Sequence, residues 1–246
     1  KFFFAFSYSS KMPATNGVPE TEGYTIEKKL TPTAEKCIVD SRKVLYDKDK
    51  TPADYVQCYE DYWAHSYDMD GEDLGFQAWT YATEMIKKFV PNKDALILDY
   101  CGGTGQVGKR LGALGYKNLH HSDGSSNMQK QAKALNVYSK FFTEVVNRGE
   151  KADYLSKETK YDVVLSSMSL CEFKALVQQV FEEGLKPGGI FIAIESLPHV
   201  ESCQLDGITW ALEESKKPNS MLELIEDDEE KPHDQFTDHP TKIIVV

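Results

Sequence analysis

A short apolar strand that leads into a glycine-rich turn and then a helix is the most constraining feature of this sequence. The strand is Ala95-Leu-Ile-Leu-Asp99, the turn holds Gly102, Gly103 and Gly105, and a helix is predicted over 106–114. Glycines let the backbone turn sharply and approach a ligand without interference from side chains. The free N–H groups at the start of the next helix favour electronegative ligand atoms. The segment therefore predicts a ligand site at the carboxyl end of a buried strand.

Apolar strands and amphipathic helices alternate along the rest of the chain. The predicted strands are 95–99, 117–123, 138–146, 161–165, 190–194, 221–225 and 242–246. The predicted helices are 52–62, 74–89, 106–114, 126–135, 172–185 and 205–215, and Lys186-Pro-Gly-Gly189 is predicted as a turn. This rhythm indicates an α/β fold, namely a three-layer, doubly wound, mostly parallel seven-stranded sheet that ends in a reversed edge strand. Ligands bind such sheets beyond the carboxyl ends of the strands.

The chain divides into an N-terminal extension over 1–50 and one domain over 51–246. The extension is rich in Thr, Pro, Lys and Glu with little periodicity, so we expect it to be weakly ordered. Its apolar start is shorter than the ~7–15 residues of a signal-peptide core. We interpret residues 1–11 as translated upstream sequence or the start of a fragment, and 243–246 as a strand cut off midway.

The charge of the chain is acidic and uneven. The 246 residues hold 28 Lys and Arg against 39 Asp and Glu, a net charge of -11, and ten acids against three bases fall between Glu213 and Asp238. This balance argues against binding to nucleic acid, which needs clustered basic residues. The block 226–238 is either a solvated loop or, in the sharper hypothesis, an acidic rim that attracts cationic substrates such as amines.

The cysteines and the apolar runs favour a cytoplasmic protein. The five cysteines are widely spaced without a Cys-x-x-Cys pair, so neither a disulfide framework nor a zinc site is expected. No apolar run approaches the ~18–20 residues of a membrane span, so no membrane partner is expected.

The glycine loop fits two cofactors. Gly103-x-Gly105-x-x-Gly108, with Asp123 20 residues after Gly103, matches the dinucleotide fingerprint. The alternative is the S-adenosylmethionine loop, an acid followed by alternating glycines. Asp99 at the end of the strand favours the second reading, because a carboxylate there suits an ammonium and repels a pyrophosphate.

Five motifs in order then resemble a known family. They are the loop itself, Trp63-Ala-x-x-Tyr67-Asp68, Asp123-Gly-Ser-x-x-Met128, Tyr161-Asp-Val-Val and Lys186-Pro-Gly-Gly. Together they resemble class I S-adenosylmethionine-dependent methyltransferases over roughly 55–246, most closely the Williams–Beuren syndrome methyltransferase-like group. The resemblance implies a Rossmann-like methyltransferase fold with an N-terminal helical lid and S-adenosylmethionine as cofactor. It also implies a small-molecule methyl acceptor.

The resemblance assigns cofactor-binding roles to residues of four strand ends and of the lid. Asp99 and the backbone of the loop would hold the methionine end, and Asp123 would accept hydrogen bonds from the ribose. Glu144 or Val145 would border the adenine, and Tyr67, with Tyr59 or Tyr62, would close over the cofactor. The full set also includes Cys101, Gly102, Gly103, Gly105, Gly124, Ser125, Met128 and, facing the methyl group, Ser166 and Ser167. Cys101 stands where the family has its first glycine.

The sequence carries no fixed catalytic signature. Methyl transfer is a displacement on an activated sulfonium, so the protein mainly aligns the nucleophile and excludes water. Glu172 and Glu195 are the candidates for a general base or a substrate anchor. Adjacent His120 and His121 point to opposite faces of a strand, so no metal site is expected. The alternatives are an NAD(P)-dependent oxidoreductase, which would use the Gly103-x-Gly105-x-x-Gly108 loop, and a non-catalytic methyltransferase-like binding protein.

Overall fold

The computed structural model describes most of the chain from Thr51 onward and three residues before it, and all statements below concern the described residues. The described residues are 3–4, 36, 51–73, 75–147, 149–155, 159–167, 169, 174–196, 210, 213, 216 and 241–245. The predicted strand 221–225, most of the predicted helix 205–215 and the acidic block 226–238 lie outside them.

Five parallel strands form the centre of the sheet. They are β4 (Lys140–Thr143), β3 (Asn118–Asp123), β2 (Leu96–Tyr100), β5 (Tyr161–Ser167) and β6 (Leu185–Ser196), in that spatial order. The chain runs outward from β2 to β3 and β4, and then returns to the other side of β2 with β5 and β6. This reversal of strand order beside β2 is the place where parallel α/β sheets bind ligands.

Two further strands extend the sheet beyond β6. β7 (Thr241–Val245) pairs antiparallel with β6, and β1 (Phe3–Phe4) pairs antiparallel with β7. The predicted reversed strand is therefore present, but among the described residues it is not the edge strand, because β1 lies outside it. The predicted set of seven strands stays a prediction, since one of its members, 221–225, is not described.

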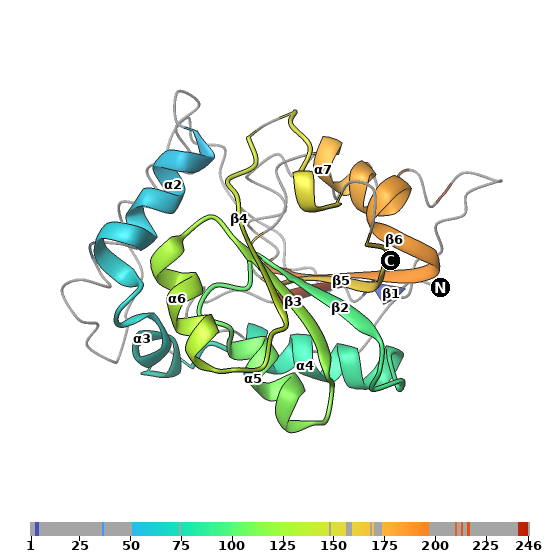
Figure 1. Cartoon of the computed structure of the whole chain (residues 1–246), viewed down its shortest axis with the longest axis horizontal. Helices are drawn as coiled ribbons and strands as arrows, with labels where there is room; N and C mark the ends of the chain where they lie inside the picture. Colours follow the sequence, from blue (N-terminus) through green and yellow to red (C-terminus); the bar gives the residue numbers. More distant parts are fainter. Residues whose placement is uncertain are drawn as a thin grey trace, which may run out of the picture.

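Helices cover both faces of the sheet (Figure 1). α4 (Ala78–Phe89) and α5 (Gln106–Ala113) lie together on one face, with α6 (Ser126–Ala134) beside β3 and β4. The other face carries α7 (Lys174–Gln179), which continues as the π-helical turn η3 (Val180–Gly184). The three layers that the alternation predicted are confirmed.

The segment before α4 forms a separate helical arm. It consists of α2 (Pro52–Cys58), the π-helical turn η1 (Tyr59–Trp63) and α3 (Tyr67–Asp73), and it lies along α6 at the left of Figure 1. α2 starts cleanly because Pro52 occupies its first turn, and Thr51 and Asp54 form a reciprocal capping box.

Three of the differences between the observed and the predicted element boundaries have a clear local form. The predicted helix 74–89 begins only at Ala78, after Gly75 takes a positive φ of 71°. The predicted strand 138–146 is confined to β4. The Lys186-Pro-Gly-Gly189 turn lies within β6, where the register jumps from Tyr161↔Leu185 to Val163↔Ile190. These four residues form an irregularity in a strand, because hydrogen bonding to β5 resumes after them.

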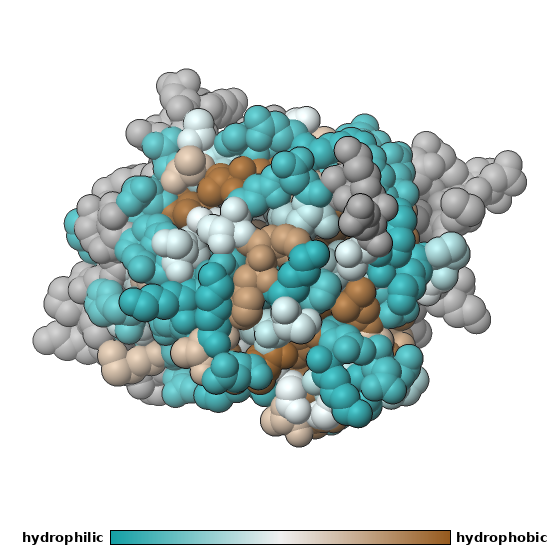
Figure 2. Space-filling model, viewed as in Figure 1, coloured by the Kyte–Doolittle hydropathy of each residue, from teal (hydrophilic) through white to brown (hydrophobic). Residues whose placement is uncertain are grey.

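The core fills the space between the sheet and its helices. Ile97, Leu98, Val164, Leu165 and Ile192 are fully buried in the middle of the sheet. No helix among the described residues is both long and apolar enough to cross a membrane. The face in Figure 2 is mainly hydrophilic, with apolar residues reaching the surface only in short strips.

Candidate functional site

The glycine loop and two strand-end carboxylates meet at the carboxyl edge of the sheet. β2 and β3 are hydrogen-bonded neighbours in which Asp99 stands opposite His121. The loop 101–105 continues from β2, and Asp123 ends β3. Gly103 donates its N–H to Asp123 Oδ2 at 2.8 Å, so the two motifs that the sequence separated by 20 residues are in direct contact.

Asp99 lies buried beneath the loop. Its side chain is 2% exposed, its Oδ2 accepts a hydrogen bond from Tyr138 Oη at 2.5 Å, and its Oδ1 has no partner among the described residues. Burial raises the pKa of the Asp99 carboxyl to about 7, and the nearby charge of Asp123 adds to the rise against the lowering effect of Tyr138. Asp99 is thus a buried carboxylate with one unsatisfied oxygen at the site.

Tyr138 joins Asp99 to the helix that follows the loop. Its Oη accepts the N–H of Gly108 at 3.1 Å while it donates to Asp99. A Cβ at position 108 would lie 2.1 Å from that Oη, so only glycine fits there. The third glycine of the Gly103-x-Gly105-x-x-Gly108 pattern therefore allows a tyrosine to pack against α5.

Asp123 binds the backbone of the glycine loop and of the residue that caps α6. Its Oδ2 holds Gly103, and its Oδ1 accepts the N–H of Ser125 at 2.7 Å. Burial raises the pKa of Asp123 to about 6, although the hydrogen bonds from Ser125 and Gly103 oppose this. Ser125 in turn caps α6 by accepting the N–H of Met128 at 3.1 Å.

His121 supports the loop from the sheet. The side chain is fully buried, and its Nε2 lies 3.0 Å from the carbonyl oxygen of Gly103. Burial lowers the pKa of His121 to about 4, so the ring is neutral near pH 7. His120, its neighbour, contacts Tyr161 Oη at 3.1 Å instead. No group of His, Cys, Asp and Glu among the described residues is arranged to hold a metal ion.

Asp68 connects the helical arm to the loop. Its two carboxylate oxygens accept hydrogen bonds from Thr104 Oγ1 and Gln106 Nε2, each at 2.5 Å. Thr104 and Gln106 flank Gly105, the N-cap residue of α5, and both are buried. A carboxylate from α3 is therefore fixed at the start of this helix, where N–H groups favour negative charge.

Glu60 makes a second connection, from η1 to α6. Its carboxylate accepts the N–H of Ser126 at 2.5 Å and that of Asn127 at 3.1 Å. Burial would raise the pKa of Glu60, but these hydrogen bonds outweigh it and hold the pKa below its usual value. The arm is thus attached at both motifs that were predicted to bind the cofactor.

Tyr67 lies within an aromatic cluster of the arm. Its ring contacts Trp63 at 5.0 Å, Tyr59 at 6.1 Å and Trp79 at 6.2 Å between centroids. Trp63 is buried and donates its indole N–H to Asp70 at 3.1 Å. Tyr67 directly precedes Asp68 in the chain, and Asp68 bonds to Thr104 of the loop. Tyr67 therefore lies close to the loop. The side chain of Tyr62 lies outside the described residues.

Four further predicted cofactor residues follow the ends of β3 and β4, namely Gly124, Met128, Glu144 and Val145. A Cβ on Gly124 would lie 2.9 Å from Val56 and 3.0 Å from Val145, so α2 approaches the site here. Met128 is buried. The Glu144 carboxylate accepts the N–H of Asp153 at 3.2 Å from each oxygen. This contact gives Glu144 a structural partner that the sequence did not suggest.

The end of β5 and the start of the loop complete the edge. Ser166 Oγ lies 2.8 Å from Ser169 Oγ, and Ser167 Oγ is buried without a partner among the described residues. Cys101 is half-buried with a positive φ of 50°, a conformation that glycine adopts more easily. Burial raises the pKa of its thiol, so this cysteine is not an activated nucleophile.

The two candidate bases are not placed by the structure. Glu172 lies outside the described residues. Glu195 pairs through its backbone with Lys242 in the β6–β7 ladder, and its side chain is not described. Both assignments therefore stay predictions.

The sequence did not predict Tyr138 as part of the site. It also did not predict that Asp68 and Glu60 bind to the site from the helical arm. Tyr138 had no signal, because it was placed inside a predicted strand. Asp68 was visible as the acid after Tyr67 in a motif that accompanied the resemblance, but its partners lie 36 and 38 residues away. Long-range pairs of this kind leave no local periodicity.

Residues 98–193 match a family described as "Methyltransferase domain". This methyltransferase match begins in β2 and ends in β6, so it spans the glycine loop, both carboxylates and the five parallel strands.

A human protein named methyltransferase-like protein 27 is 33% identical over 135 residues. The aligned part covers 54% of this chain and 54% of that protein, so the chain matches about half the length of its curated relative. Among solved structures, the CcbJ methyltransferase of Streptomyces caelestis is 19% identical, with a TM-score of 0.44 and coverage of 57% of this chain and 58% of that one. The complex of DhpI with S-adenosylhomocysteine is 18% identical, with a TM-score of 0.43 and coverage of 58% and 68%.

Proposed function

We propose that this chain transfers a methyl group from S-adenosylmethionine to a nucleophilic nitrogen, oxygen or sulfur of a small-molecule acceptor. One observation carries the proposal: Asp68, Asp99 and Asp123 place three carboxyl groups around the glycine loop. Negative charge at this loop repels the pyrophosphate of a dinucleotide and attracts a cation. S-adenosylmethionine brings a sulfonium and an ammonium. The methyltransferase match over 98–193 supports the same conclusion.

The residues of the loop fit such a cofactor. A Cβ built on Gly103, whose φ is 56°, meets nothing within 4 Å, so a ligand can approach the backbone there. Each oxygen of Asp123 accepts one backbone N–H, which leaves a second lone pair for a ribose hydroxyl. Asp99 faces the methionine end from below through its charge and its unpartnered Oδ1.

The chain's own residues then contribute alignment and shielding. The bound cofactor supplies an activated methyl group. Asp68 and Glu60 hold the helical arm over the loop, and Tyr67 closes the site from the arm and limits access of water. Ser166 and Ser167, at the end of β5, face the acceptor. A general base is needed only for an acceptor that arrives protonated, and Glu172 and Glu195 remain the candidates for it.

The charge of the sequence supports one class of acceptor. The acidic block 226–238, if it forms the rim of the site that the sequence suggests, would favour a cationic acceptor such as an amine by raising its local concentration. Membership of the Williams–Beuren syndrome methyltransferase-like group and a cytoplasmic location stay predictions.

A thermal-shift titration tests the proposal. S-adenosylhomocysteine should raise Tm, and NADH should not. Asp123→Ala should abolish most of the shift because it removes the group for the ribose and frees Gly103. Asp94→Ala is the matched control. Asp94 is an exposed carboxylate whose one ion pair among the described residues, with Lys117, is long at 3.8 Å and therefore weak.

The opposite pattern would overturn this function. Stabilisation by NADH alone would favour the oxidoreductase. Binding of S-adenosylhomocysteine without turnover in a broad screen of labelled acceptors would favour a non-catalytic binding protein.

A further inference from the structure

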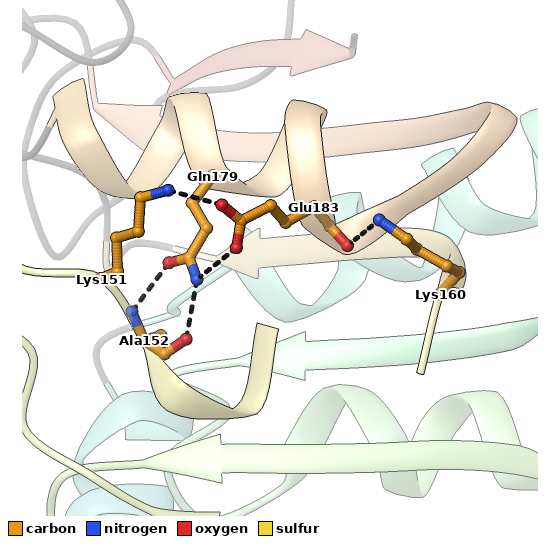
Figure 3. A network of polar contacts seen from close by, with 5 residues as sticks. All are labelled: Lys151, Ala152, Lys160, Gln179 and Glu183. Atoms are coloured by element: carbon orange, nitrogen blue, oxygen red, sulfur yellow. Dashed lines mark hydrogen bonds and ion pairs between the residues drawn. The ribbon is translucent and has the colours of Figure 1, made fainter. Parts of the chain in front are cut away.

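A buried amide holds the turn that follows β4. Gln179, the last residue of α7, has no exposed surface. Its Oε1 accepts the N–H of Ala152 at 2.8 Å, and its Nε2 donates to the carbonyl oxygen of Ala152 at 2.9 Å (Figure 3). One side chain thus satisfies both backbone groups of a fully buried residue, which buried backbone requires.

The held turn reaches the cofactor site. Ala152 directly precedes the 3-10 turn η2 (Asp153–Leu155). The ring of Tyr154 in this turn stacks on Phe142 of β4 at 4.9 Å and lies 6.5 Å from Tyr100 at the end of β2. Phe142 and Thr143 of β4 pair with Ser122 and Asp123 of β3, and Glu144 accepts the N–H of Asp153 in the turn, so the turn packs against the strand end that carries Asp123.

The other end of the turn packs on the same helix. Leu155 is fully buried, and its Cδ2 would lie 3.1 Å from a Cβ on Gly184 of η3. The turn is therefore attached to α7 and η3 at Ala152 and Leu155, with Tyr154 between them. Gln179 supplies the polar part of this attachment.

The exposed charged side chains near Gln179 bind to Glu183. Lys151 pairs with Glu183 at 2.5 Å, and Lys160 donates to the carbonyl oxygen of Glu183 (Figure 3). The paired side chains of Lys151 and Glu183 are 56% and 35% exposed, and ion pairs of this kind contribute little to stability. The buried amide, not the surface pair, fixes the turn.

We propose that Gln179 is a positioning residue for the cofactor site. Its amide holds residues 152–155 against α7, so that Tyr154 and Glu144 keep their places beside Asp123. The proposal rests on the proposed function, because the positioned site is the one assigned to S-adenosylmethionine. Gln179 touches neither the cofactor nor the acceptor, and it acts through Ala152.

The first experiment separates positioning from general stability. Gln179→Leu keeps the size of the side chain but removes the partner of the Ala152 N–H and one of the two donors to its carbonyl, which keeps the N–H of Leu155 at 3.2 Å. We expect the Kd for S-adenosylhomocysteine, measured by calorimetry, to rise roughly tenfold. Val177→Ala, a buried residue of the same helix outside the turn, should lower Tm without changing this Kd. An equal loss of affinity in both variants would overturn the proposal.

Gln179→Glu gives an independent readout, also if Gln179→Leu fails to fold. A protonated carboxyl can accept from the N–H and donate to the carbonyl of Ala152, whereas a carboxylate cannot donate. The ratio of its Kd to the wild-type Kd should therefore fall as the pH is lowered. The charged groups that face position 179 are the same in both proteins. They are Glu183, whose Oε2 lies 3.4 Å from Gln179 Nε2, and the two lysines that bind to it, Lys151 and Lys160.

The two proposals fail in distinguishable ways. A pH-independent ratio would contradict the role of Gln179 alone. Absence of S-adenosylhomocysteine binding in the wild type would instead remove the proposed function on which the role depends.

Discussion

At the scale of single residues, the site depends on carboxyl groups whose partners come from distant parts of the chain. The sequence indicated Asp99, Asp123 and the loop, because each ends a strand or forms a turn. It did not indicate Tyr138, which is 39 residues from Asp99 and 30 from Gly108. Packing between α5 and the segment before β4 creates that contact.

The buried state of Asp99 predicts a pH dependence of stability. The folded-state pKa is about 7, above the ordinary value of 3.8. The stabilising contribution of Asp99 is therefore complete below about pH 4 and is lost as the pH rises through 7. Asp99→Asn lacks this titration, so its free energy of unfolding should rise relative to the wild type between those pH values. Urea unfolding at several pH values measures the difference.

The lowered pKa of His121 changes the free energy of unfolding with pH in the direction opposite to that of Asp99. Because His121 is present in both proteins, its contribution cancels when Asp99→Asn is compared with the wild type. A difference that stays constant from pH 4 to 7 would mean that the Asp99 carboxyl titrates normally.

At the scale of elements, the helical arm is attached both to the glycine loop and to α6. The pattern of the sequence predicted a helix at 52–62, and the family resemblance implied that this part of the chain forms a lid. The attachments of Asp68 to the loop and Glu60 to α6 became visible in the tertiary structure, since each joins residues 36 to 67 positions apart.

Removal of one attachment should loosen the arm. Asp68→Ala deletes two charge-assisted hydrogen bonds, each about 1.5–3 kcal/mol when one partner is charged. We expect faster hydrogen exchange over residues 52–73 and weaker binding of S-adenosylhomocysteine. Glu72→Ala, an exposed carboxylate on the same helix, should change neither. Unchanged exchange in Asp68→Ala would contradict a role of Asp68 in holding the arm and would leave Glu60 and Gln131 as its polar attachments.

At the scale of the whole molecule, the net charge of -11 should affect both stability and binding. Between about 0.01 M and about 0.15 M salt the Debye length falls from about 30 Å to about 8 Å, which screens repulsion among the acidic groups. The free energy of unfolding should therefore rise with salt. The affinity for cationic S-adenosylmethionine should fall more than that for S-adenosylhomocysteine, which lacks the sulfonium. Calorimetry with both ligands tests this, and identical salt slopes would contradict an electrostatic role.

The sequence by itself determined the alternation of strands and helices and the strand–loop–helix unit after residue 95. These follow from periodicity and from glycine, which act over a few neighbouring residues. Only the tertiary structure decided which groups surround the loop and how Gln179 holds the turn beside Asp123. Such partners are selected by packing between elements far apart in the chain, and a single buried contact leaves no repeating pattern along the sequence.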